Sequence, residues 1–311
     1  MANPTWTHGG HRIGDARRKE SERPLEAGPS PLPSRGGGRQ PEVVVVQEGR
    51  ARSTWRAVTV PSEHGGWGLT LEPVVLGLLI APSVAGVTLG VTAFLTFLVR
   101  TPLKLALVDL RRDRWLARSR LATKVAAVEL TAIAILAMVA TALAGPGWWA
   151  AVAVAVPFVA VELWFDIRSR SRRLAPELCG AIGVCAVVAA ITIAAGEDRA
   201  MAAALWVLLA ARAVAAIPFV RTQILRLRAA ADIPVDVHFA DVAQVAAVVL
   251  GAFAVALVGS TIAGFIALIA MAALQLTWLR RPPVPAKVLG TRQMGLGLAL
   301  VIVTAAGVAL T

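Results

Sequence analysis

Residues 124–165 read KVAAVELTAIAILAMVATALAGPGWWAAVAVAVPFVAVELWF, and this stretch decides the fold. It contains two apolar runs, in which Glu129 and Glu162 are the only acidic residues, and a Gly-Pro-Gly turn at 145–147 separates them. Each run has about the 20 helical residues that cross a bilayer core of ~30 Å. Because glycine and proline interrupt helices, the stretch predicts two membrane-spanning helices joined by a short turn.

The rest of the 311-residue chain repeats this pattern, since 57% of all residues are hydrophobic and 16% are charged. Soluble domains are about a quarter charged, which excludes a soluble globular enzyme. We predict an all-α, polytopic membrane protein with nine transmembrane helices. The predicted spans are residues 66–81, 83–99, 124–144, 147–165, 176–195, 200–220, 240–258, 260–279 and 292–310.

The first two of these spans are predicted to form a hairpin. The run from Leu69 to Val99 has Glu72 as its only charge, and as one helix it would be ~46 Å long at 1.5 Å per residue. Such a helix is too long for one crossing. Pro82 lies near the middle of the run and favours a break there.

Residues 1–56 differ from the rest of the chain because they are rich in proline, glycine, serine and arginine. Such a composition buries too little apolar surface to offset the entropy of the chain. We therefore predict a disordered basic tail at 1–56 and a transmembrane domain at 57–311. No apolar signal-peptide core precedes Leu69, so the tail is expected to stay in the cytosol.

The net charge of +12 comes from 31 basic and 19 acidic residues. The tail and alternate loops hold 29 of the 31 Lys and Arg residues, at 1–60, 100–124, 166–176, 221–240 and 280–292. Positive loops stay in the cytosol, which predicts a cytosolic N-terminus and an external C-terminus. These basic residues lack interleaved aromatics, so we expect no nucleic-acid partner and assign the charge to anionic membrane lipids.

Polar side chains inside the predicted spans all lie in the cytosolic half of that topology. Ionisable groups in a bilayer usually face a bundle interior or an aqueous cavity. The sequence therefore predicts a polar cavity open to the cytosol and a dry external half. Equally well, one arginine pairs with one glutamate only to hold the bundle together. These residues are Glu72, Glu129, Glu162, Arg212, Gln244 and Gln275.

Two cytosolic segments near the start of the domain can contribute to a site. The first reads Pro-Ser-Glu-His-Gly-Gly-Trp at 61–67, and a plain membrane-entry loop explains it at least as well. In the second, Asp109 and Asp113 have a spacing that predicts one helical face. Two such carboxylates can share a divalent cation that carries a diphosphate. The alternative is an exposed helix with salt bridges to its own arginines, and the spacing alone favours it.

Two further segments are basic. The turn at 168–173 contains four arginines, which can bind phosphate oxygens by paired hydrogen bonds. The positive-inside rule accounts for them equally well. After the sixth predicted span come Arg221 and Gln223, and then Asp232 and Asp236, which Pro234 separates.

The 61–67 motif, followed by Glu72-Pro73, resembles the P-x-E-H-G-x-W opening of the YwiC-like membrane proteins. The resemblance extends over most of residues 58–310. It implies a multi-pass protein of the bacterial plasma membrane. That family is functionally uncharacterised, so it implies no reaction.

A second similarity is to the UbiA-type intramembrane prenyltransferases, which have nine helices and polar loops after spans two, four and six. It implies Mg²⁺ and an isoprenoid diphosphate or related anionic lipid as ligands, with Asp109 and Asp113 as metal ligands. The chain departs from that family at Leu105, which replaces an expected asparagine, and in having no run of aspartates directly after span six.

The resemblance implies that basic residues neutralise the leaving diphosphate while acidic residues or a histidine position the acceptor or take its proton. The candidate catalytic residues are Glu63, His64, Glu72, Glu129 and Glu162. The candidate substrate-binding residues are Trp67, Arg100, Lys104, Arg170, Arg173, Arg212, Arg221 and Gln223. The competing hypothesis is a non-catalytic membrane protein, either a transporter or an assembly or scaffold factor.

Overall fold

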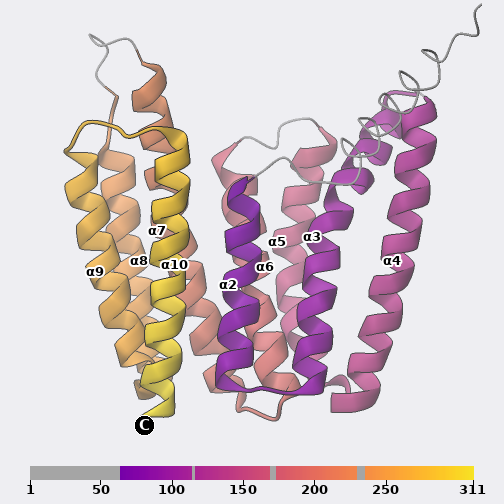
Figure 1. Cartoon of the computed structure of the whole chain (residues 1–311), viewed down its shortest axis with the longest axis horizontal. Helices are drawn as coiled ribbons and strands as arrows, with labels where there is room; N and C mark the ends of the chain where they lie inside the picture. Colours follow the sequence, from indigo (N-terminus) through magenta and orange to yellow (C-terminus); the bar gives the residue numbers. More distant parts are fainter. Residues whose placement is uncertain (1–63, 114–115, 169–172, 230–234) are drawn as a thin grey trace, which may run out of the picture. The chain divides into compact units, whose positions relative to one another are not determined.

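The structure is a computed structural model that describes residues 64–113, 116–168, 173–229 and 235–311. Every regular element in these ranges is a helix, which confirms the predicted all-α fold (Figure 1). The predicted tail at 1–56 lies outside the described residues. The α-helices are α2 (His64–Ile80), α3 (Val84–Arg111), α4 (Ala117–Ala144), α5 (Trp149–Ile167), α6 (Leu174–Ala194), α7 (Arg199–Arg228), α8 (His238–Leu257), α9 (Ile262–Leu279) and α10 (Ala286–Ala309). Two 3₁₀ helices, η1 (Pro146–Trp148) and η2 (Gly259–Thr261), precede α5 and α9.

The predicted hairpin between the first two spans is confirmed. Helix α2 ends at Ile80 and α3 begins at Val84, so the break includes Pro82. The Ser83 hydroxyl caps α3 by accepting a hydrogen bond of 2.9 Å from the backbone N–H of Gly86. Eight of the described helices are long and apolar enough to cross a membrane, whereas α2 has 17 residues and is shorter. The count of nine spans therefore remains a prediction.

The Gly-Pro-Gly turn at 145–147 also forms where it was predicted. Gly145 ends α4 with a φ of 73°, a left-handed conformation that glycine adopts without steric cost. The indole N–H of Trp149 donates a 3.0 Å hydrogen bond to the Thr141 hydroxyl, and Trp149 stacks on Trp148 at a centroid distance of 4.4 Å. These contacts fix the turn between α4 and α5.

Two helices extend well beyond their predicted spans. The span predicted to end at 99 continues as α3 to Arg111, and the span predicted to end at 220 continues as α7 to Arg228. Each continues through one proline, Pro102 or Pro218, which lacks a backbone N–H donor. The residues after each proline are mostly leucine, arginine and other good helix formers. Both helices therefore carry basic side chains on ordered backbone beyond the apolar segment.

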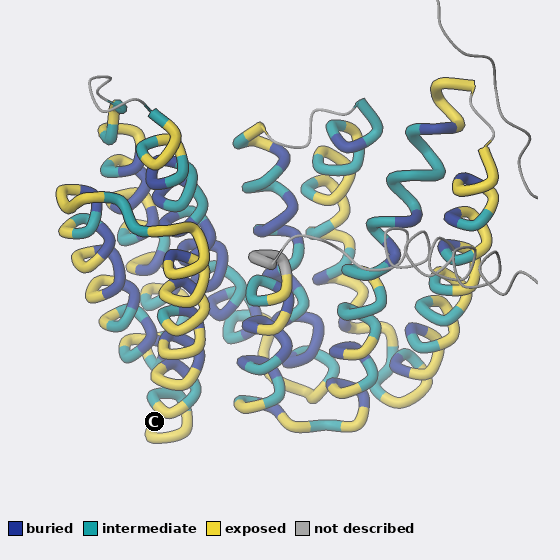
Figure 2. Tube along the Cα trace, turned by 45° about the horizontal axis from the view of Figure 1, so that its top comes forward, coloured by how far each residue is buried: buried dark blue, intermediate teal, exposed yellow. Residues whose placement is uncertain are grey.

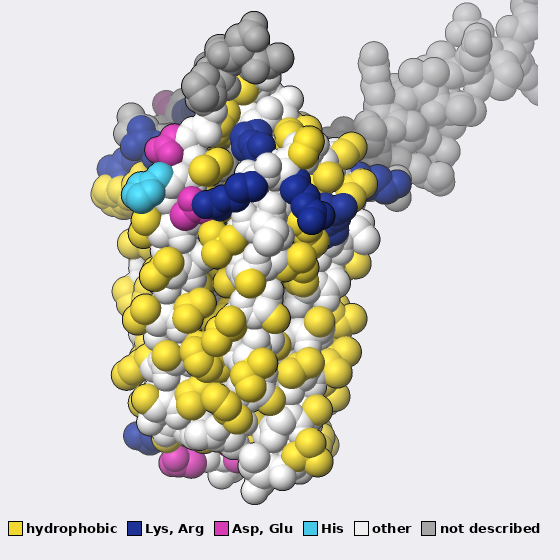
Figure 3. All heavy atoms as spheres, turned by 90° about the vertical axis from the view of Figure 1, so that its left-hand side faces the viewer, with side chains coloured by type: hydrophobic (Ala, Val, Ile, Leu, Met, Phe, Trp, Pro, Cys, Tyr) yellow, Lys and Arg dark blue, Asp and Glu magenta, His cyan; other side chains and the backbone are white. Residues whose placement is uncertain are grey.

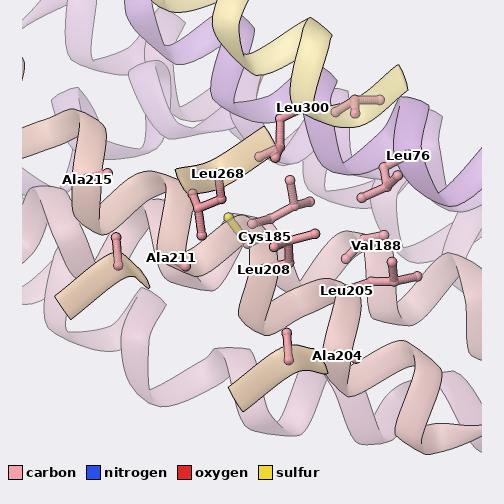
Figure 4. Close-up of a cluster of buried hydrophobic side chains, with 14 of the residues drawn as sticks. Leu76, Cys185, Val188, Ala204, Leu205, Leu208, Ala211, Ala215, Leu268 and Leu300 are labelled. Carbon is pink, nitrogen blue, oxygen red and sulfur yellow. The ribbon is translucent and has the colours of Figure 1, made fainter. Parts of the chain in front are cut away.

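Helix α2 is in contact with helices that are far from it in the sequence. It packs against α6 and α10, while α6 also packs against α5 and α7, and α9 packs between α8 and α10. Their shared core contains large buried side chains from several helices, including Leu76, Leu208, Leu268 and Leu300 (Figure 4). Alanines such as Ala211 fill the spaces between them. Small residues let membrane helices approach closely, where van der Waals packing is the main source of attraction.

Burial differs strongly between helices, as Figure 2 shows. Helix α7 contributes fully buried leucines to the core, including Leu205 and Leu208. Helix α4 exposes Val128 and Met138, at 71% and 63%. An apolar outward surface of this kind suits contact with lipid. The centre of the domain is therefore at α7, and this is where the polar residues meet.

Candidate functional site

Two buried charged residues form an ion pair between α2 and α7. Nη2 of Arg212 lies 2.8 Å from Oε1 of Glu72, and it also donates a 2.8 Å hydrogen bond to the backbone carbonyl of Gln293 on α10. Arg212 is 3% exposed and Glu72 is 8% exposed. Instead of lining an open cavity, as the sequence predicts, these two side chains are buried against each other. They tie three helices together at one point.

A chain of buried glutamines continues from this pair. The Gln275 amide nitrogen lies 3.4 Å from Oε1 of Gln293, and the Gln244 amide nitrogen donates to Oε1 of Gln275 at 3.0 Å. Gln244 also donates to the backbone carbonyl of Ala215 at 2.9 Å. The resulting polar network connects α2, α7, α8, α9 and α10. Several buried atoms in it lack a hydrogen-bond partner in the described chain, namely Nε of Arg212, Oε1 of Gln244 and Nε2 of Gln293.

The glutamines of the network lie toward the end of the helices where the basic loops attach, whereas the ion pair lies near the middle of its helices. Gln244 is six residues after the start of α8 and Gln275 is four residues before the end of α9. Glu72 is the ninth of the 17 residues of α2, and Arg212 is the fourteenth of the 30 residues of α7. The predicted one-sided distribution therefore fits the glutamines better than the ion pair. Sequence reasoning missed Gln293, because the predicted span began at 292, whereas α10 begins at Ala286 and places Gln293 about two turns inside.

A second charged cluster joins α3 to α5. Arg100 contacts Oε1 of Glu162 at 2.7 Å and Oδ2 of Asp166 at 3.1 Å, while Nζ of Lys104 lies 3.2 Å from Oδ1 of Asp166. Asp166 is buried, and both basic side chains are about one-third exposed. Helix α6 approaches so closely that a Cβ at Gly180 would overlap the Glu162 carboxylate. Two residues predicted to bind substrate therefore neutralise acidic groups of the chain itself.

The two predicted metal ligands have different environments. Asp109 is buried on α3 and accepts a 2.6 Å hydrogen bond from the Ser119 hydroxyl, with Arg118 at 3.5 Å. Asp113 is exposed beyond the end of α3, with a φ of 51°. The prediction that both share one helical face is wrong, because the helix ends at Arg111.

These positions do not fit a pair of carboxylates around Mg²⁺. The Asp109 oxygens already accept hydrogen bonds from Ser119 and Arg118, whereas Asp113 is an exposed turn residue two positions beyond the end of α3. Within the described ranges, no group of three or more His, Cys, Asp or Glu side chains is arranged to hold a metal ion.

The remaining candidates lie at several places. Arg221 contacts Glu177 at 2.8 Å, with both side chains about one-third exposed. The Trp67 ring packs edge-on against Phe97 at 5.1 Å, and Arg173 is exposed just before α6. Among the described contacts, Oε2 of Glu129 is buried without a hydrogen-bond partner, on the peripheral helix α4.

The side chains of three candidate residues are not described. Glu63 and Arg170 lie outside the described residues, as do Asp232 and Pro234. His64 is the first residue of α2, but its side chain is not described. The described candidates form separate contacts, Glu72 with Arg212, Arg100 with Glu162, and Arg221 with Glu177.

Comparison with known proteins agrees with the motif at the start of the domain. No curated protein and no solved structure matches the chain. The similarity to UbiA-type prenyltransferases therefore remains a prediction. Residues 60–192, which include α2 to α5 and nearly all of α6, match the family model described as YwiC-like protein, so the resemblance indicated by the 61–67 motif is confirmed over that part of the chain.

Proposed function

We propose that the protein is a non-catalytic integral membrane protein, an assembly or scaffold factor, in which buried charges hold the helices together. The contact between Arg212 and Glu72 carries this proposal, because it joins helices from opposite ends of the domain. The contact with Arg212 occupies the carboxylate that a catalytic base would offer to a substrate. Glu162 is likewise paired with Arg100.

A transporter fits less well. Transport needs a site near the middle of the membrane with access from both faces. The buried ion pair does lie near the middle of α2 and α7, but Arg212 is only 3% exposed and Glu72 only 8%, so neither side chain is open to solvent.

The second candidate is a divergent transferase for an isoprenoid diphosphate. It is favoured by the cluster of Arg100 and Lys104 on α3, whose partly exposed side chains contact Glu162 and Asp166, shortly before the arginine-rich 168–173 segment in the sequence. On this hypothesis these two cations would bind the diphosphate and neutralise its charge as it leaves. Glu162 would then exchange its partner for the ligand.

Ligand-induced stabilisation separates the two candidates. The scaffold proposal predicts that farnesyl diphosphate with Mg²⁺ leaves the melting temperature of the purified full chain unchanged. A transferase would be stabilised by about 2.7 kcal/mol at a ligand concentration 100 times Kd. A saturable shift that Arg100→Gln abolishes and Arg120→Gln preserves would contradict the scaffold proposal. Arg120 is a suitable control because it is an exposed arginine on α4.

The predicted topology has its own test. In a variant without Cys179 and Cys185, single cysteines replace Glu197, before α7, and Lys287, at the start of α10; both native positions are exposed. Because positive loops stay inside, a membrane-impermeant thiol reagent is expected to label Glu197→Cys in intact cells, and Lys287→Cys only after permeabilisation. Labelling of Lys287→Cys in intact cells would contradict the predicted orientation.

A further inference from the structure

A small pocket lies where α7, α9 and α10 meet, at the end that carries the basic loops. It has a volume of 220 Å³, which is smaller than pockets that enclose drug-sized ligands. It is separate from the Glu72 and Arg212 pair, which does not line it. The lining residues are Phe219, Gln223, Trp278, Arg281, Pro282, Val284, Leu289 and Arg292.

Hydrogen bonds from α7 to the last carbonyls of α9 hold one wall of the pocket. The Gln223 amide nitrogen donates to the Trp278 carbonyl at 3.0 Å, and Arg226 donates to the Leu279 carbonyl at 2.7 Å. Helix ends leave such carbonyls without partners unless a side chain provides one. The wall is therefore built by side chains that span two helices.

The oxygen of the same Gln223 amide group, in contrast to its nitrogen, forms no hydrogen bond with the described residues. Gln223 is 2% exposed, and its Oε1 is buried without a hydrogen-bond partner in the described chain. A buried acceptor of this kind costs free energy until a donor reaches it. Since Gln223 also lines the pocket, the missing donor is expected to come from a bound group.

Two arginines supply positive charge to the same pocket. The Arg292 guanidinium lies over the Trp278 ring, 4.8 Å from its centroid. Neither Arg281 nor Arg292 forms a salt bridge with a described residue. By contrast, Arg280 makes a two-pronged contact with Asp241, and this hydrogen bonding raises the pKa of Arg280. Figure 3 shows that Lys and Arg side chains gather at one end of the displayed face, above a largely hydrophobic surface.

These observations specify the chemistry of a ligand. Guanidinium groups favour a phosphate oxygen. The donor to Oε1 of Gln223 is expected to be a neutral hydroxyl, because two nearby cations disfavour an ammonium group. Phe219, Val284 and Leu289 add an apolar side, and the position at the ends of the helices corresponds to the headgroup level of a bilayer.

We propose that this pocket binds the headgroup of a phosphatidylglycerol-type lipid, with the phosphodiester at Arg281 and Arg292 and a glycerol hydroxyl donating to Oε1 of Gln223. The proposal goes beyond the scaffold function and is independent of it. A free glycerol phosphate offers the same chemistry, so the test must distinguish a lipid from a soluble source.

Native mass spectrometry of the full chain can count bound lipids of matched acyl chains. Phosphatidylglycerol is expected to bind about fivefold more tightly than phosphatidylmethanol, which has the same charge but no hydroxyl, as one hydrogen bond suggests. Arg281→Gln and Arg292→Gln should each weaken phosphatidylglycerol binding about fivefold. Arg120→Gln, an exposed arginine outside the pocket, should have no effect.

Three results would overturn the proposal. Equal binding of phosphatidylglycerol and phosphatidylmethanol would show that no lipid hydroxyl donates to Oε1 of Gln223. If Arg281→Gln and Arg120→Gln weaken phosphatidylglycerol binding equally, general surface charge and not the pocket explains the binding. Displacement of the lipid by an equal concentration of glycerol 3-phosphate would identify a soluble ligand. Melting temperatures without added lipid confirm that the variants, which change exposed side chains, remain folded.

Discussion

Arg212→Ala is expected to destabilise the protein by about 3–5 kcal/mol, because it leaves the Glu72 carboxylate buried without its counter-charge. Glu72→Ala should have a similar effect, since Arg212 would then be the unpaired charge. The double variant should be less destabilised than the sum of the two single variants, because neither charge remains. Reversible unfolding of the purified chain in detergent measures all three free energies of unfolding.

The contact between Arg221 and Glu177 is a matched control for this prediction. It has the same distance of 2.8 Å, but both side chains are about one-third exposed. Exposed ion pairs contribute roughly 0–1 kcal/mol, so Arg221→Ala should have a small effect. If Arg212→Ala is no more destabilising than Arg221→Ala, the buried pair does not hold the bundle together, and the scaffold proposal loses its main support.

The sequence predicted the class of fold because apolar runs of membrane-spanning length depend only on local composition. Pairing of Arg212 with an intramembrane glutamate was one of two interpretations that the sequence left open. The sequence did not predict that the partner is Glu72, because the choice depends on which helices are neighbours. Helix α2 meets α7 through the packing of α6 and α10 against α2, and no local pattern encodes that arrangement.

The predicted helical face shared by Asp109 and Asp113 is wrong for a different reason. A spacing of four residues places Asp109 and Asp113 on one face only if the helix continues through both. The helix instead ends at Arg111, and Ser119 at the start of α4 hydrogen-bonds to Asp109. Helix ends are set by capping and by contacts with neighbouring elements, so they are less predictable than the helices themselves.

Gly297→Ala on α10 should have the second large effect, a destabilisation of about 2–3 kcal/mol. A Cβ at this position would overlap the Glu72 carboxylate and lie 2.6 Å from Nη2 of Arg212. Both groups are buried, so they can move only by giving up their ion pair or by separating the helices. Thermal unfolding of the purified variant measures the effect.

Gly295→Ala is the matched control, because it lies on the same helix and a Cβ there meets no atom within 4 Å. Alanine is a better helix former than glycine by up to about 1 kcal/mol, so this variant should be neutral or slightly more stable. In a Glu72→Ala background the overlap with the carboxylate is removed and only the contact with Nη2 of Arg212 remains, so the cost of the added methyl group at Gly297 should decrease. A cost that stays the same in that background would show that Gly297 does not act through the ion pair, and that the close approach of α10 has another origin.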